Sequence, residues 1–166
     1  MLYIEYYRSA LRHLDVCKTM MDYLDSMQGN TCLSGKRERL KLDIYYLSGY
    51  IIETMISYTF FVSLNWQKNV PIEKCQHYNK GFKTHKLSSK ILFATSKVYC
   101  DYSGIPLLGN RIDDSTERKM FNSWSEVVRY QNPKTYSKLE FSEGDLRRYL
   151  SQIELMFKQL TNKYHI

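Results

Sequence analysis

The stretch that decides the fold is residues 44–64, IYYLSGYIIETMISYTFFVSL, in which Glu53 carries the only charge. An apolar run of this length could cross a membrane. The carboxylate at its centre and its interspersed serines, threonines and tyrosines argue instead for a helix that other helices surround on most sides. We therefore expect a central bundle helix over 36–64. A buried carboxylate needs a partner, so Glu53 should pair with an arginine or a tyrosine.

The first 30 residues predict a second long helix, because apolar and aromatic residues recur every three or four positions. These are Tyr3, Tyr7, Ala10, Leu14, Cys17, Met21 and Leu24. The helix should cover 3–27 and end before the stop signal Gln28-Gly29-Asn30. Similar patterns predict helices over 85–101, 113–128 and 143–163 and a short one near 71–79. Thr84 and Ser142 are expected N-caps, and Gly49 should let a neighbouring helix approach closely.

The composition agrees with one all-α domain over 1–166. Seven glycines and three prolines in 166 residues are about half the usual share of ~12%, too few for the turns of a β-sandwich or barrel. The four cysteines form no C-x-x-C pair and predict reduced thiols. Glu5 interrupts the first apolar residues, which argues against a signal peptide. We therefore expect a cytoplasmic protein without a membrane segment.

The net charge of +7 is unevenly distributed. Residues 71–100 hold six lysines and one glutamate, and a second basic segment, KRERLK, covers 36–41. A local positive field favours anionic partners, of which RNA is the commonest. Lysines that only keep helix faces soluble would give the same pattern.

Common catalytic and phosphate-binding motifs are absent from the sequence. It contains no P-loop, no G-x-G-x-x-G and no G-x-S-x-G. Cys75 and His77 are the only close Cys/His pair, and a zinc site would need two more ligands nearby. We therefore expect neither a metal site nor a cofactor.

Four short motifs, in this order along the chain, resemble those of the HEPN domains, a family of small all-helical proteins. LRHL at 11–14 suits the start of their first helix. GYIIE at 49–53 resembles their Gly-Tyr step followed by Glu, although Ser57 stands where the family usually has lysine. THKL at 84–87 resembles the His-x-Leu opening of their third helix. WSEVVRY at 124–130 resembles the Arg-Tyr step that closes their fourth.

The resemblance implies an up-and-down bundle of four to five helices, usually a cytoplasmic homodimer tied to RNA metabolism, toxin–antitoxin pairs or defence. Many family members are metal-independent endoribonucleases with an Arg-x4-6-His motif. Here Arg8 and His13 match that spacing but lie on the first helix, whereas the family places its motif near the penultimate one. Arg129 is in the right region, but no histidine follows it before His165. The resemblance therefore favours the Arg-Tyr branch, whose members have been thought to bind nucleotides or partner proteins.

Three hypotheses for the function remain open. The first is a binding or regulatory module, a HEPN-like dimer that holds a nucleotide, RNA or a protein partner without turnover. The second is a metal-independent ribonuclease, with Arg8 and His13 as catalytic candidates. The third is a structural partner of a nucleotidyltransferase. The candidate ligand-binding residues are Glu53, Lys83, His85, Lys86, Arg129 and Tyr130.

The sequence also predicts where an anion and a second subunit would bind. The strongest positive surface is expected from Lys80 through Lys90, with Arg129 close by. Fifteen tyrosines are more than one small core should need, and aromatic residues are enriched at interfaces. We therefore expect a homodimer formed through the first or last helix.

Overall fold

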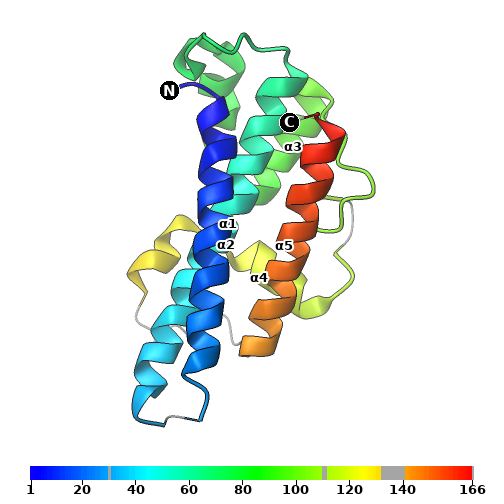
Figure 1. Ribbon diagram of the computed structural model, residues 1–166. Coiled ribbons are helices and arrows are strands. Elements are labelled where there is room, and N and C mark those ends of the chain that lie inside the picture. The colour runs from blue at the N-terminus through cyan, green and yellow to red at the C-terminus, as the bar shows by residue number, and fades with distance from the viewer. Residues whose placement is uncertain (30, 110–111, 132–140, 166) are drawn as a thin grey trace.

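The computed structural model describes residues 1–29, 31–109, 112–131 and 141–165, and this part of the chain is helical without any strand (Figure 1). The five α-helices are α1 (Ile4–Ser26), α2 (Ser34–Ser63), α3 (Leu87–Val98), α4 (Ser115–Ser123) and α5 (Glu143–Lys163). Four short helical turns join them: η1 (Thr31–Leu33), η2 (Ile72–Lys74), η3 (Tyr78–Phe82) and η4 (Glu126–Tyr130). The all-α prediction is confirmed for these residues.

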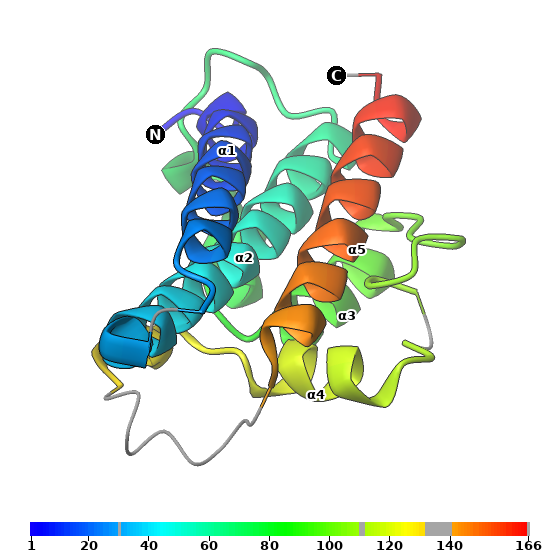
Figure 2. The same ribbon diagram turned by 60° about the horizontal axis from the view of Figure 1, so that its bottom comes forward.

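Helix α2 lies at the centre of the molecule and contacts α1, α3, α5 and η4. Figure 2 shows α2 between α1 and α5, with α3 behind it. Residues 51–61 are buried without interruption, which is the result of packing on every side. In the described ranges, no helix is long and apolar enough to span a membrane.

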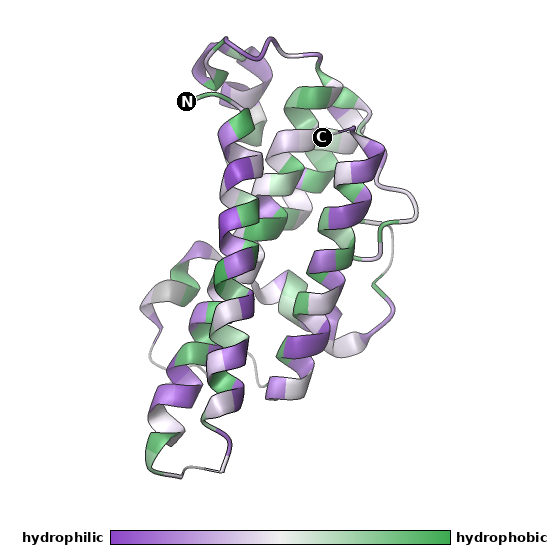
Figure 3. Ribbon diagram, in the orientation of Figure 1, coloured by the Kyte–Doolittle hydropathy of each residue, from purple (hydrophilic) through white to green (hydrophobic). Residues whose placement is uncertain are grey.

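Helix α1 buries the predicted stripe against α2. Six of its seven members are buried and Tyr7 is half-buried. The two helices form an antiparallel hairpin that extends beyond the first turn of α5 (Figure 1). Figure 3 shows that the last turns of α2 are mainly hydrophobic, whereas the first turns of α5 are mainly hydrophilic. The apolar residues of α2 are therefore concentrated toward the end that carries both termini.

An aromatic cluster fills that end of the bundle. Phe60 stacks on Phe82 with ring centroids 4.0 Å apart, and Tyr3 lies 5.5 Å from Tyr58. Of the tyrosines that the structure describes, only Tyr23, Tyr99 and Tyr130 are exposed. The core therefore uses most of the tyrosines on which the dimer prediction depended, and homodimerisation stays a prediction.

Helices α3 and α4 are shorter than the sequence predicted. Helix α3 begins at Leu87, so His85 precedes it, and Thr84 accepts a hydrogen bond from the amide of Lys86 without capping the helix. Helix α4 ends at Ser123, because Trp124 and Ser125 are extended before the chain turns again into η4. The predicted cap of α5 is confirmed, since Ser142 and Asp145 form a reciprocal capping box.

Gly49 permits a close approach, but by a side chain rather than by a helix. A Cβ at this position would lie 2.0 Å from Nε1 and Cε2 of Trp124. The indole lies close enough to α2 for Nε1 to donate a hydrogen bond to the carbonyl of Tyr46, at 3.0 Å. Trp124 is 4% exposed, so its side chain is part of the core.

Candidate anion-binding pocket

Glu53 has two cationic or ionisable partners on segments distant in sequence. Its side chain on α2 is only 10% exposed. The carboxylate oxygens lie 3.0 and 3.1 Å from Nδ1 of His85, and Oε1 lies 3.5 Å from Nζ of Lys90 on α3. Among the described side chains, a histidine and a lysine pair with Glu53; the predicted pairing with an arginine is not tested, because the side chain of Arg129 lies outside the described part.

Lys90 is 3% exposed and is held on three sides. Its ammonium donates a hydrogen bond to Oγ of Ser57 at 3.1 Å and lies 4.2 Å from the ring centroid of Phe82. Burial lowers the pKa of Lys90, and the neighbouring Glu53 carboxylate opposes that shift. Lys90 is consequently a counter-ion for Glu53, and the predicted positive surface loses this member.

His85 contacts the buried Glu53 carboxylate and is itself partly exposed to solvent. Its side chain is 53% exposed, and its ring lies edge-on to Tyr50 at 6.4 Å. When Nδ1 donates its proton to the Glu53 carboxylate, the lone pair is on Nε2, which bonds to no described residue. Glu53 and His85, both candidate ligand-binding residues from the sequence, are therefore in direct contact.

A pocket of about 560 Å³ opens above this pair. One wall is α1, with Arg12 and His13, and the other consists of Tyr50 on α2 and the segment 83–85. The His13 ring lies 6.2 Å from the ring of Tyr50. Burial, and then the neighbouring Arg12, lower the pKa of His13, which favours a neutral imidazole at pH 7.

The pocket has an excess of positive charge. Of its two carboxylates, Glu53 is paired with Lys90, and Glu5 bonds to Arg8 at 2.7 Å. The two remaining cations, Arg12 and Lys83, are both exposed and form no ion pair with any residue the structure describes. The pocket can therefore attract an anion without first breaking a salt bridge.

Arg8, Lys86 and Tyr130 do not line this pocket. Arg8 is exposed and bonded to Glu5, so it does not form a site with His13. Lys86 is exposed at the N-cap of α3, and Tyr130 is 80% exposed on η4. The side chain of Arg129 lies outside the described part, so its predicted role is not addressed.

Sequence reasoning missed most of the pocket's side chains, among them Arg12, Tyr6 and Tyr78. Arg12 is next to His13 and could have been found by asking which cations share a helix face with it. Tyr6 and Tyr78 also line the pocket, with their hydroxyl groups 3.3 Å apart. No local signal connects these two tyrosines, because they are 72 residues apart.

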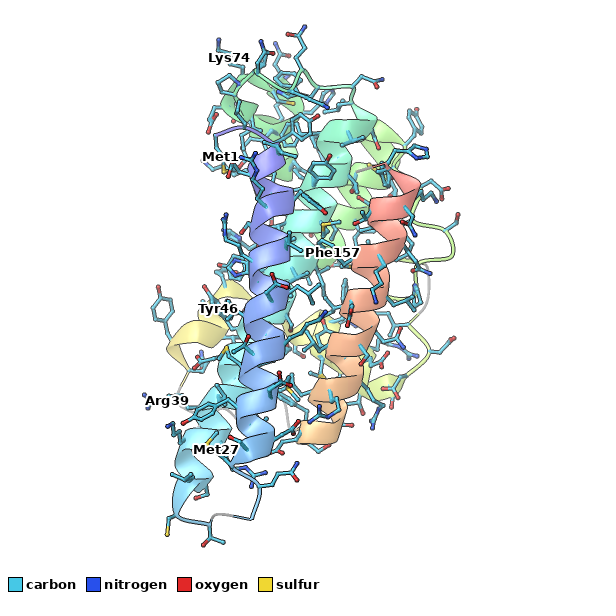
Figure 4. All side chains as sticks on the ribbon, in the orientation of Figure 1. Met1, Met27, Arg39, Tyr46, Lys74 and Phe157 are labelled. Atoms are coloured by element: carbon cyan, nitrogen blue, oxygen red, sulfur yellow. The ribbon has the colours of Figure 1, made fainter. Side chains whose placement is uncertain are left out.

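The two basic segments of the sequence do not form one surface. Figure 4 shows Lys74 near Met1 at one end of the molecule and Arg39 near Met27 at the other. In the second segment, Arg37 bonds to Glu143 at 2.5 Å and Lys41 to Glu38 at 3.0 Å. These contacts neutralise much of its charge.

Comparison with protein-family models, curated proteins and solved structures gives no match to this chain. Within the described ranges, no group of three or more His, Cys, Asp or Glu side chains is arranged to hold a metal ion.

Proposed function

We propose that the protein is a HEPN-like binding module whose pocket takes the phosphates of a nucleotide or of RNA. The observation that carries this proposal is the pair of cations Arg12 and Lys83, which form no ion pair with any described residue and line one pocket from α1 and from the segment after η3. A guanidinium and an ammonium are the groups that proteins use for phosphate recognition. The imidazoles of His13 and His85 add hydrogen-bonding groups beside them.

The rest of the lining suits a nucleotide better than a bare inorganic anion. Tyr6, Tyr50 and Tyr78 supply aromatic surface, and aromatic side chains commonly stack on bases. The volume of about 560 Å³ is within the roughly 300–1,000 Å³ of ligand pockets. A homodimer and a nucleotidyltransferase-type partner, in a toxin–antitoxin or defence setting, belong to the same proposal through the family resemblance alone.

One observation favours a second function, a metal-independent endoribonuclease. The Glu53 carboxylate holds Nδ1 of His85, an arrangement that leaves the other ring nitrogen free to act as a general base. The catalytic group would then be His85 rather than the predicted pair Arg8 and His13. RNA cleavage that His85→Gln abolishes, with EDTA present, would support this alternative.

Binding of a fluorescein-labelled single-stranded RNA, followed by anisotropy, tests the proposal. We expect Arg12→Gln and Lys83→Gln each to weaken binding several-fold. Lys86→Gln, which removes the same charge three residues away but outside the pocket, should have a smaller effect. Each lost phosphate contact should reduce the slope of log affinity against log salt concentration by about 0.7. Equal affinities for the parent, Arg12→Gln and Lys83→Gln proteins would refute the proposal.

A further inference from the structure

His85 lies between the Glu53 carboxylate and the open pocket. On one side of its ring, Nδ1 lies 3.0 and 3.1 Å from the two carboxylate oxygens of Glu53. The other ring nitrogen, Nε2, bonds to no described residue, and the side chain is 53% exposed and lines the pocket. An ionised carboxylate and the phosphate of a nucleic acid backbone both offer oxygens that accept hydrogen bonds. An anion beside Nε2 would therefore place the ring between two acceptors.

A neutral imidazole cannot bond to both acceptors, because it has one N–H group and one lone pair. If the N–H group is at Nδ1, it bonds to Glu53, and the lone pair of Nε2 faces the anion. If the N–H group is at Nε2, it bonds to the anion, and the lone pair of Nδ1 faces the carboxylate at 3.0 Å. The imidazolium donates from both nitrogens, so it is the form of His85 that bonds to Glu53 and to an anion at once.

The buried ion pair behind His85 makes this proton depend on the anion. Lys90 lies 3.5 Å from Oε1 of Glu53, and both side chains are 10% exposed or less. Because these two charges cancel, a proton on His85 gives the cluster an unbalanced positive charge. In the free pocket, the cations Arg12 and Lys83 on the same lining repel that charge. A bound anion offsets the repulsion, so the anion and the proton should each favour the binding of the other.

The other titratable rings that line the pocket are unsuited to take up this proton. On α1, burial and then the neighbouring Arg12 lower the pKa of His13. Burial raises the pKa of Tyr50 on α2 and of Tyr6 on α1, so both phenols are neutral and have no proton to gain. The hydroxyl of Tyr6 donates to that of Tyr78 at 3.3 Å.

The remaining charged groups near His85 are carboxylates and ammonium groups. Glu5 bonds to Arg8 at 2.7 Å, and the amino group of Met1 is engaged by the carboxylate of Glu73 at 2.8 Å. Carboxylate and lysine side chains ordinarily change charge well outside pH 6 to 8, so His85 is the side chain left to take up the proton. The others are Lys83 and Lys86 beside it in the chain and Glu126 on η4, a turn that contacts α2.

We propose that the pocket binds the phosphate of its ligand together with a proton, with Nε2 of His85 donating to a phosphate oxygen while Nδ1 donates to Glu53. The proton comes from the solvent, and no covalent bond forms. This inference rests on the proposed function and deepens it, because it makes phosphate binding stronger as the pH falls from 8 to 6.

Calorimetric titration with a uridine tetranucleotide that has no terminal phosphate tests it, since neither the bases nor the phosphodiesters of this ligand change charge between pH 6 and 8. Heats measured in two phosphate-free buffers of different ionisation enthalpy give the number of protons taken up. One proton per bound anion raises the affinity at most about tenfold for each pH unit. We expect a rise of at least about tenfold in all from pH 8 to pH 6.

His85→Gln separates the role of the proton from that of the pocket. The amide of glutamine donates a hydrogen bond without titrating, so this variant should still bind the oligonucleotide but should lose the proton uptake and most of the pH dependence. His77→Gln is the matched control, because His77 is exposed and does not line the pocket. In the parent protein, nitrogen NMR of the imidazoles should show that Nε2 of His85 becomes protonated when the oligonucleotide is added.

Two sets of results would overturn the inference and are distinguishable from each other. If the parent binds the oligonucleotide equally well at pH 6 and pH 8, or if proton uptake persists in His85→Gln and is lost in His13→Gln, the coupling to His85 fails and the proposed function stands. If the oligonucleotide binds at neither pH at low salt, while circular dichroism confirms a folded helical protein, the proposed function fails as well.

Discussion

The buried pair of Glu53 and Lys90 should be strongly coupled in stability. Removing one member of a buried ion pair typically costs about 3–5 kcal/mol, because it leaves the other charge without compensation. Lys90→Met leaves Glu53 with His85, and Glu53→Gln leaves Lys90 with Ser57 and the face of Phe82. We therefore expect each single change to cost about 3 kcal/mol, at the lower end of that range.

The double variant tests this coupling. Glu53→Gln with Lys90→Met removes both charges, so it should cost about 3–4 kcal/mol in total instead of the sum of about 6, a coupling of about 2–3 kcal/mol. At about 2–4 °C per kcal/mol for a chain of this size, each single variant should melt about 6–12 °C below the parent.

Urea denaturation followed by circular dichroism at 222 nm measures these values. Lys97→Met is the matched control: this lysine is on the same helix, two turns beyond Lys90, and is exposed. Its cost should stay within about 0.5 kcal/mol and should add to that of Glu53→Gln. Additive costs for Glu53→Gln and Lys90→Met would show that the two side chains are independent and would refute the pairing.

Three further changes follow from the packing and the charges. Gly49→Ala should lower the free energy of unfolding in a urea titration by about 2–4 kcal/mol, because the indole of Trp124 must move and lose its hydrogen bond. In the control Gly35→Ala, on the same helix, the added Cβ meets no neighbour, so the change should be neutral or stabilising by up to about 1 kcal/mol. Equal effects of the two substitutions would contradict the contact between Gly49 and Trp124. Ser142→Ala should cost about 1 kcal/mol by removing the cap of α5, and an unchanged midpoint would argue against that cap. Because the pKa of His13 in the native protein is below its ordinary value of 6.5, the unfolded chain binds more protons than the native one as pH falls through 6.5, and the stability of the protein should fall over that range. The His13→Gln variant should lose less stability over the same range. Identical pH profiles of stability for the parent and the variant would contradict this expectation.

The helices could be predicted because their signals are local. The mainly apolar run at 44–64 and the stripe from Tyr3 to Leu24 each predict a helix with at least one buried face, whichever helix packs against it. The Ser142 cap likewise depends only on residues three positions apart. The start of α3 was misplaced because Thr84, a good cap residue in sequence, binds the amide of Lys86 in a turn that precedes the helix.

The candidate site was predicted only in part, because its contacts are long-range. Glu53 required a partner, but the sequence contains many cations and nothing local selects Lys90, which is 37 positions away. The same limit applies to Gly49: the need for close packing was visible, whereas the identity of Trp124 as the neighbour depends on the path of the chain after α4. Lys83 and Lys86 look equivalent in sequence, and only the fold assigns Lys83 to the pocket.

The most direct test of the account is a titration of the histidine imidazole signals by two-dimensional NMR, with adenosine 5′-monophosphate and then a 5′-phosphorylated triadenylate as ligands. The four histidines are at positions 13, 77, 85 and 165, and only His13 and His85 line the pocket. The account predicts saturable shifts for His13 and His85, with His77 and His165 unchanged, and loss of those shifts in the Arg12→Gln/Lys83→Gln double variant. Shifts confined to His77 or His165, or signals that no ligand moves, would contradict it.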